Sequence, residues 1–214
     1  MPAEKKAAKA APRPYHHGNL RDELIRCGKE RLKAGPLAQL SLRKIAGDAG
    51  VSQVAPKHHF GNKEGLLAAI AASGFRDLTE FRYSRLKPGM NAEQRLRILL
   101  SSYVAFAMNN PALFHLMFAP QVKVSEATPE LNESSSQSYH LLAGSVADFF
   151  GDMNHGAQPG ISADEAARSA WACMHGLATL MLEHRINPLR VPRYSREQLV
   201  DRSIDLIFAG MRAS

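Results

Sequence analysis

The sequence predicts an all-helical fold of about nine helices, and three observations support this. Apolar residues recur at intervals of three and four, the spacing that gives a helix one apolar face. Alternating patterns typical of strands are scarce along the chain. Gly and Pro residues separate the apolar segments, and several segments begin with a helix-capping pair: Asn91 with Gln94, Ser162 with Glu165, and Ser195 with Gln198.

The expected elements follow in chain order. Residues 1–17 are small, basic and proline-containing, which predicts a disordered arm. A first helix is expected from about residue 19 to residue 34, with Asn19 as its N-cap. The later helices are expected at 42–48 and 53–59, from 63, at about 91–109, 112–118 and 129–150, and from 162 and 195.

The positive charge of the chain is concentrated at its N-terminal end. Residues 1–60 contain twelve Lys and Arg against five Asp and Glu, a difference of seven that equals the formal net charge of the whole chain. The remaining residues contain equal numbers of basic and acidic side chains. A basic end joined to a neutral body is typical of a module that binds a polyanion, followed by a module with another task.

Composition also limits location and chemistry. No run of about 18 apolar residues could span a membrane, and the N-terminus lacks the apolar segment of a secretion signal. We therefore expect a cytoplasmic protein with no membrane partner. Cys27 and Cys173 lie outside any CxxC pattern, which favours two small buried residues over a disulfide or a zinc site. No cofactor and no metal are expected.

The stretch from Ser41 to Leu67 predicts two short helices joined by a sharp turn. Ser41 can cap the first, and Gly50 can take the positive φ that turns the chain at its end. Ser52 is then expected to cap the second. Two helices joined by a three-residue turn with Gly form a helix-turn-helix unit, whose second helix enters the major groove of DNA.

The second short helix is expected to pack Val51, Ala55 and Phe60 inward. Its outward residues would be Gln53, Val54, Lys57 and His58. Gln suits bidentate recognition of adenine, and Lys suits guanine or phosphate. Asn62 is expected to cap the next helix, where free N–H groups and Lys63 would bind a backbone phosphate.

The run SLRKIAGDAGVS, followed by HF and NKEGLL, resembles the DNA-binding domain of the TetR family of bacterial transcription regulators over residues 19 to about 66. One position departs from the family pattern. The family usually has a Tyr three residues before Phe60, where this chain has Lys57; Pro56 before it resembles one subgroup of the family. A Lys contacts phosphate only as a mobile charge, so the resemblance implies DNA binding with a stronger dependence on salt.

The same resemblance implies a role for each residue of the unit. Phosphate contacts are implied for Ser41, Ser52, Lys57, His59 and Lys63; base contacts are implied for Gln53, Val54 and His58, with Arg43 near the groove. The residues alone leave simpler roles open: the two serines as helix caps only, His59 as a brace of the turn, and Lys63 as a solvated charge. The basic arm could lie in a minor groove or stay solvated.

Two later runs, NPALFHLMF at 110–118 and WACMHG at 171–176, resemble the C-terminal domain of a TetR subgroup with a Trp-His-Gly signature. The resemblance implies a disordered basic arm over 1–17, a helix-turn-helix DNA-binding domain over 18–65, and a helical ligand-binding and dimerisation domain over 66–214.

A homodimer is also implied, with the last two helices of each subunit packed as a four-helix bundle. Apolar residues surround the predicted eighth helix over 166–182, which indicates burial on several sides. The expected interface residues are Leu177, Leu180, Met181, Ile204, Ile207, Phe208 and Met211. These residues could instead close the core of a monomer.

A ligand pocket among the central helices is the last implication. Aromatic and Met side chains are typical of small-molecule sites and favour an apolar or aromatic effector, although each could belong to the core. The candidates are Tyr103, Phe106, Phe114, Met117, Tyr139, Leu142, Trp171, Met174 and His175. We therefore expect a repressor that binds a palindromic operator as a homodimer and is released by a small molecule.

Two alternatives remain. A DNA-binding protein that is indifferent to sequence would need only the basic surface. An enzyme is not expected, because the sequence has no HExxH, no Gly-rich phosphate loop and no GxSxG.

Overall fold

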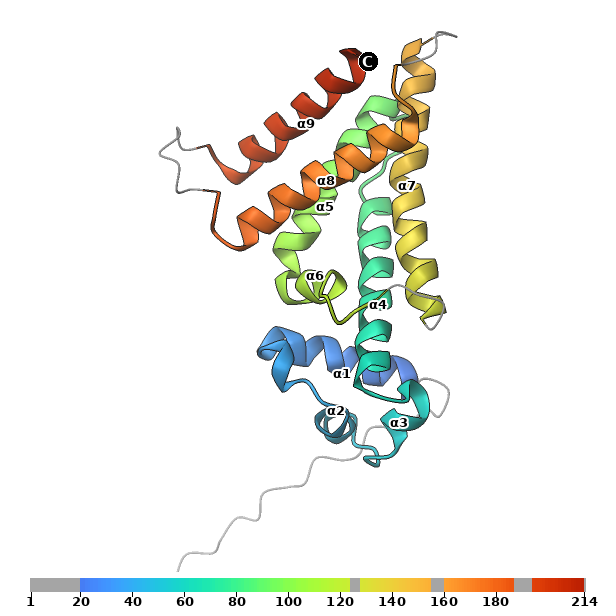
Figure 1. Cartoon of the computed structure of the whole chain (residues 1–214), viewed down its shortest axis with the longest axis vertical. Coiled ribbons are helices and arrows are strands. Elements are labelled where there is room, and N and C mark those ends of the chain that lie inside the picture. Colours follow the sequence, from blue (N-terminus) through green and yellow to red (C-terminus); the bar gives the residue numbers. More distant parts are fainter. Residues whose placement is uncertain (1–19, 124–127, 155–159, 187–193, 214) are drawn as a thin grey trace, which may run out of the picture.

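The structure is a computed structural model that describes residues 20–123, 128–154, 160–186 and 194–213. Within these residues the chain forms nine α-helices, one short 3-10 helix and no strand, which confirms the predicted all-helical fold (Figure 1). The helices are α1 (Leu20–Ala34), η1 (Leu37–Gln39), α2 (Leu42–Asp48), α3 (Ala55–Phe60), α4 (Lys63–Tyr83), α5 (Ala92–Asn109), α6 (Pro111–Met117), α7 (Pro129–Asn154), α8 (Ala163–Leu182) and α9 (Arg196–Ala213).

The long helix α4 connects the two ends of the molecule. At one end α4 packs with α3 and α1, and the contact with α1 extends to Ser73 and Asp77; α4 also lies against α7 (Figure 1). We call α4 beyond its first turn, together with α5 to α9, the body of the molecule. Within it, α9 packs on both α5 and α8. Helix α6 is in contact with α1, α4 and α5, so it lies between the two ends.

Side-chain caps begin most helices where the sequence predicts them. Ser41 accepts a hydrogen bond from the backbone N–H of Lys44, and Asn62 accepts one from Gly65. Complete capping boxes begin α5 and α8, and Ser195 with Gln198 forms the same reciprocal pair before α9. The predicted N-cap Asn19 and the basic arm lie outside the described residues.

The predicted start of the second short helix is wrong. A helix capped by Ser52 would need the backbone N–H of residue 56 to bond to the Ser52 carbonyl, but residue 56 is a proline and has no N–H. Instead the N–H of Ala55 bonds to that carbonyl in a turn, and α3 begins at Ala55 with Pro56 in its first turn. Val54 takes the cap position without a side-chain cap, so Gln53 and Val54 stand before α3.

The core is continuous from α1 to α9, and large side chains such as Leu66, Leu78, Phe114 and Phe208 are fully buried in it. Helix α8 contributes a single buried stripe, so the prediction that it is buried on several sides is wrong for the single chain. The far side of α8 exposes Ala172, Cys173 and Leu180. Cys27 is buried, whereas Cys173 is not.

None of the helices in the described residues is both long and apolar enough to cross a membrane.

Candidate nucleic-acid interface and ligand cavity

We call α1, α2, α3 and the first turn of α4 the head of the molecule (residues 20–66). Two glycines shape its turns. Gly50 has φ +67° after α2, and the next residue, Val51, returns a hydrogen bond of 3.0 Å to the carbonyl of Ala46. Gly61 has φ +72° between α3 and α4. Both are left-handed conformations that glycine adopts without strain, so the chain can turn sharply after α2 and again after α3.

The close junction of α3 with α4 depends on Gly65. A Cβ at Gly65 would stand 2.1 Å from the carbonyl oxygen of Phe60, so only glycine fits there. The head thus fixes the orientation of α3 relative to α4, the helix that enters the body.

The residues predicted to contact DNA are mostly exposed and come from α2, α3, the turn between them and the start of α4. All are exposed except Ser41 and Lys63, which are half-buried; the nine are Ser41, Arg43, Ser52, Gln53, Val54, Lys57, His58, His59 and Lys63. Val54 is 57% exposed, which is unusual for a large apolar side chain. We call these nine residues, together with the exposed Lys44, the recognition face.

The cations of the head fall into two groups. On α1, every Lys and Arg has a carboxylate partner: Arg21 with Glu130, Arg26 with Glu23, Lys29 with Asp77, Arg31 with Asp48 and Lys33 with Glu30. On the recognition face, Arg43, Lys44, Lys57 and Lys63 form no salt bridge with any described residue. The uncompensated positive charge of the head is therefore concentrated on the recognition face, as a surface for polyanion binding requires.

A cavity of about 660 Å³ lies in the body beside α4. This volume is within the range of about 300–1,000 Å³ typical of small-molecule sites. The lining comes from α4, α5, α6, α7 and α8, together with the segment after α6: Phe75, Leu78, Arg82, Tyr103, Met117, Phe118, Val122, Ser135, Ser136, Ser138, Tyr139, His140, Leu142, Arg168 and Trp171.

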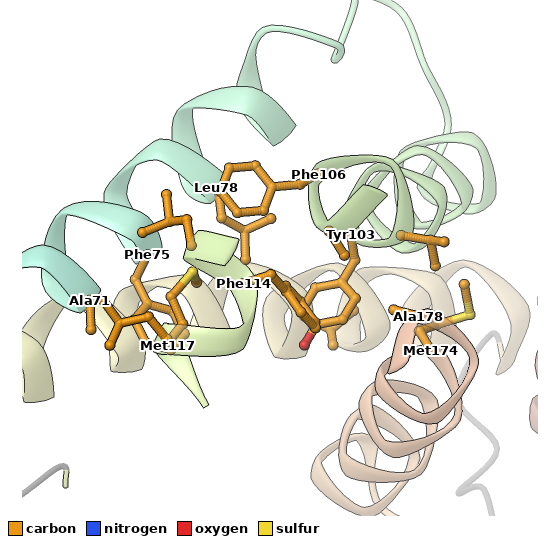
Figure 2. Packing of buried hydrophobic residues seen from close by; sticks show 14 of the residues in the cluster. Ala71, Phe75, Leu78, Tyr103, Phe106, Phe114, Met117, Met174 and Ala178 are labelled. Atoms are coloured by element: carbon orange, nitrogen blue, oxygen red, sulfur yellow. The ribbon is translucent and has the colours of Figure 1, made fainter. Parts of the chain in front are cut away.

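The predicted pocket residues divide into two sets. Tyr103, Met117, Tyr139, Leu142 and Trp171 line the cavity. The other four lie behind it: Phe106, Phe114, Met174 and His175. Figure 2 shows Phe114 beside Tyr103, with a ring-centroid distance of 5.5 Å, so it supports the wall from behind. The apolar spacing of these helices could not separate the two sets, because both face inward.

One hydrogen-bond network supports the cavity wall between α5 and α8. The Oη atom of Tyr103 lies 2.8 Å from Nδ1 of His175, and Nε1 of Trp171 donates to the same oxygen at 3.3 Å. Burial raises the pKa of the Tyr103 phenol and lowers the pKa of His175. Both groups are therefore held in their neutral forms.

Sequence reasoning missed both arginines of the cavity lining, Arg82 and Arg168. Phe75, Leu78 and Arg82 follow each other at intervals of three and four on α4, and all three line the cavity. The spacing was a usable signal, since it places Arg82 on the apolar face of its helix. Sequence reasoning also missed Lys44 on the recognition face.

The predicted dimer residues are mostly internal. Leu177, Met181, Ile204, Phe208 and Met211 are buried within the chain itself. Their assignment to an interface between subunits stays a prediction. Leu180 is 44% exposed and Ile207 is half-buried. Helical spacing identified the apolar faces of α8 and α9 correctly, but these faces pack on α5 and on each other.

Among the described residues, no group of three or more His, Cys, Asp or Glu side chains is arranged to hold a metal ion.

Solved structures show the same fold. A protein of unknown function from Rhodococcus sp. RHA1 is 29% identical, with 94% of this chain and 100% of that chain covered and a TM-score of 0.76. The transcriptional regulator FadR from Bacillus subtilis, solved in complex with stearoyl-CoA, is 17% identical, with 88% and 98% covered and a TM-score of 0.68.

Among curated proteins, the nucleoid occlusion factor SlmA of Aliivibrio fischeri is 32% identical over 104 residues. The match covers 46% of this chain and 51% of SlmA, so the chain spans about half the length of the curated relatives it matches.

The family model described as "Tetracyclin repressor-like, C-terminal domain" matches residues 96–207, more than half of the chain. These residues comprise most of the body, and the head that precedes them carries the helix-turn-helix unit. The chain belongs to the TetR family of transcription regulators.

Proposed function

We propose that this protein is a repressor that binds a palindromic operator as a homodimer and leaves it when a small molecule occupies the cavity. The observation that carries the proposal is the distribution of charge on the head. The cations of α1 are paired, whereas those of the recognition face have no carboxylate partner among the described residues.

The recognition face combines two kinds of contact. Arg43, Lys44, Lys57 and Lys63 offer positive charge to phosphates, which fixes position on the duplex without reading sequence. Gln53, Val54 and His58 add an amide, an apolar group and an imidazole, which can contact base edges. Because Gln53 and Val54 precede α3, we propose that bases are contacted from the N-terminal end of this helix.

We propose a second copy of the chain as the partner of the outer faces of α8 and α9. Ala172, Gly176 and Leu180 follow one another at intervals of four on α8, and Leu206 and Gly210 do so on α9. Leu206 is 74% exposed, the largest value among the large apolar side chains that the structure describes. Small residues beside an exposed leucine allow two helices to pack closely. A dimer with two-fold symmetry would match a palindromic operator whose half-sites are about 34–36 Å apart or more.

Helix α4 offers a mechanical link between the cavity and DNA. Lys63 of the recognition face and Arg82 of the cavity stand near its two ends, about 28 Å apart at a helical rise of 1.5 Å per residue. A ligand can release DNA only by binding better to a conformation in which the two heads of the dimer no longer match the operator. Tilting α4 would produce such a conformation.

Selection of the purified protein against random duplex DNA at about 150 mM salt tests the proposal, because non-specific contacts weaken steeply with salt. Enrichment of a palindrome is the expected result. Binding without any enriched sequence would replace the proposal with a DNA-binding protein that is indifferent to sequence, and absence of binding would overturn both.

A further inference from the structure

Arg82 is a buried cation inside the body. Its side chain is on α4 and only 3% of its surface is exposed. The Nη1 atom donates to the Ser138 carbonyl oxygen at 3.1 Å and to the Ser138 Oγ at 3.3 Å, both on α7. The guanidinium also lies over the ring of Tyr103, 5.3 Å from its centroid. These contacts hold the side chain at the cavity wall.

The charge of Arg82 has no counterion in the described part of the chain. No carboxylate there lies within salt-bridge distance, and Nε has no hydrogen-bond partner among the same residues. Burial lowers the pKa of Arg82 to about 10, so the group still carries its proton at neutral pH. A buried charge normally has a partner, because leaving water without one is costly.

The other guanidinium of the cavity differs from Arg82. Arg168 is exposed, and its Nε donates to the Asp164 carboxylate at 2.8 Å. Its charge is thus compensated within α8. Among the described residues that line it, the cavity therefore presents one uncompensated positive charge, at Arg82, next to the apolar walls of Phe75, Leu78 and Met117.

We propose that the cavity binds an organic monoanion, a carboxylate on an apolar body, with the carboxylate paired to Arg82. The planar guanidinium matches a carboxylate in geometry, and one negative charge balances one positive charge. A dianion would leave a charge unpaired against the apolar wall, and a neutral ligand would leave Arg82 as it is. This inference rests on the proposed ligand-responsive function and specifies its ligand class.

The chain carries its own reporter for the test. Trp171 is the only tryptophan, it lines the cavity, and its Nε1 donates to Tyr103, whose ring lies under Arg82. Its fluorescence can follow titrations with three probes that share one body: 4-phenylbutyrate, 4-phenyl-1-butanol and 4-phenylbutylamine. The expected order of affinity is carboxylate, alcohol, amine, with the carboxylate at least ten-fold tighter than the alcohol.

Arg82→Met should abolish the preference for the carboxylate. Its affinity for the alcohol should stay within a factor of two of the wild-type value. Arg82→Lys should retain part of the preference. The matched control is Arg85→Met, three residues later in the turn that follows α4, where the side chain is exposed and stacks on Phe81 outside the cavity; it should keep the wild-type order.

A second readout separates a ligand-binding role from a structural one. If the role of Arg82 is to bind an anionic ligand, the ligand-free Arg82→Met variant should have a melting temperature equal to or higher than that of the wild type, because the substitution removes an unpaired buried charge. Equal affinity of the wild type for the carboxylate and the alcohol would overturn the proposal, and this result does not depend on the folding of any variant.

The DNA selection keeps this inference distinct from the proposed function. A palindrome with no carboxylate preference would overturn the ligand class and leave the regulator intact. A carboxylate preference without DNA binding would overturn the proposed regulator and support the ligand class.

Discussion

Tyr103 and His175 share a hydrogen bond of 2.8 Å between the phenol oxygen and Nδ1, although they stand on different helices. Because Trp171 Nε1 can only donate, the phenol oxygen accepts from Trp171 and its own O–H is free to donate to His175. Nδ1 is then the acceptor, and the imidazole is neutral with its proton on Nε2. The cavity wall between α5 and α8 therefore depends on a neutral histidine.

This arrangement predicts a loss of stability in mild acid. Burial lowers the folded-state pKa of His175 below its ordinary value near 6.5, so the unfolded state binds more protons as the pH falls through that region. The free energy of unfolding should include the whole contribution of His175 above about pH 6.5 and should decrease as the pH falls below that value. Urea unfolding at pH 7.5 and pH 5.5 measures this decrease, which should be smaller in His175→Gln. Trp171→Phe leaves the Tyr103–His175 pair in place and should keep the wild-type decrease; equal decreases in all three proteins would exclude His175 as the cause.

A second prediction concerns the ion pair between the head and the body. Arg76 of α4 donates to Glu130 of α7 at 2.8 Å, and Arg21 of α1 donates to the same carboxylate. Burial alone would raise the pKa of Glu130, but the hydrogen bonds from the two arginines outweigh it and the pKa is lowered. Glu130→Gln should cost about 1 kcal/mol of unfolding free energy, a modest value because the side chains are more than a third exposed.

The cost of Glu130→Gln should also depend on pH. Because the pKa of Glu130 is lowered, its carboxylate stabilises the fold at pH values above the ordinary pKa of a carboxyl group. This stabilisation disappears as the pH falls through the folded-state pKa. Urea unfolding should therefore show the full difference at pH 7 and little difference near pH 3. The control is Glu133→Gln on the same helix, whose carboxylate accepts from Gln137. A cost for Glu133→Gln equal to that of Glu130→Gln would mean that the two arginines add nothing.

The sequence predicted local features better than the assignment of helix faces. Caps such as Asn62 and Ser162 follow from contacts within one turn, so they could be recognised without the fold. Ser52 predicts a helix from residue 53, but Pro56 lacks the N–H that such a helix needs, so α3 begins at Ala55. Spacing identifies the apolar face that contains Phe208, but not which helix covers that face. Arg82 was overlooked because its lack of a counterion becomes visible only when α7 and α5 are placed around it.

For DNA binding, we predict that Gln53→Ala and Lys63→Ala act differently. Gln53 is exposed before α3, so its loss should relax base preference at one operator position and cost about 1–3 kcal/mol on the preferred site. Lys63 begins α4 and should contact phosphate, so its loss should weaken binding to all sequences alike and reduce the salt dependence by about one contact. Titrations with the selected operator and with an unrelated duplex, at several salt concentrations, separate the two. Equal effects of both variants on all duplexes would remove Gln53 from base recognition.

For the proposed dimer, Leu206→Glu should convert the protein to a monomer. Leu206 is the most exposed large apolar side chain on α9, and a carboxylate placed inside a helix interface would be buried without a partner. Sedimentation equilibrium at micromolar concentration measures the mass directly. The matched control is Asp201→Glu, an exposed acidic residue near the start of α9, which should leave the dimer unchanged. A dimer that survives Leu206→Glu would place the interface on another surface.

The contact between α4 and α6 gives a prediction in which two glycines behave oppositely. A Cβ at Gly74 would lie 2.8 Å from Sδ and 2.9 Å from Cγ of Met117, whereas a Cβ at Gly144 would meet nothing within 4 Å. Both are inside helices, where alanine is favoured over glycine by about 1 kcal/mol. Gly144→Ala should therefore stabilise the protein by about that amount. Gly74→Ala should instead destabilise the protein by about 1 kcal/mol, because overpacking costs about 1–3 kcal/mol and outweighs the gain in helix propensity.

The displaced side chain also connects Gly74 to the cavity. Met117 lines the cavity from α6, and Figure 2 shows it beside Phe75, so a methyl group at Gly74 should push it toward the ligand space. Gly74→Ala should then weaken binding of 4-phenylbutyrate several-fold, with Gly144→Ala at the wild-type value. In a Met117→Ala background the same change at Gly74 should become nearly neutral, because most of the clash is gone. Urea unfolding of the four proteins gives the coupling, and a stabilising Gly74→Ala in the wild-type background would show that α4 and α6 are not packed this closely.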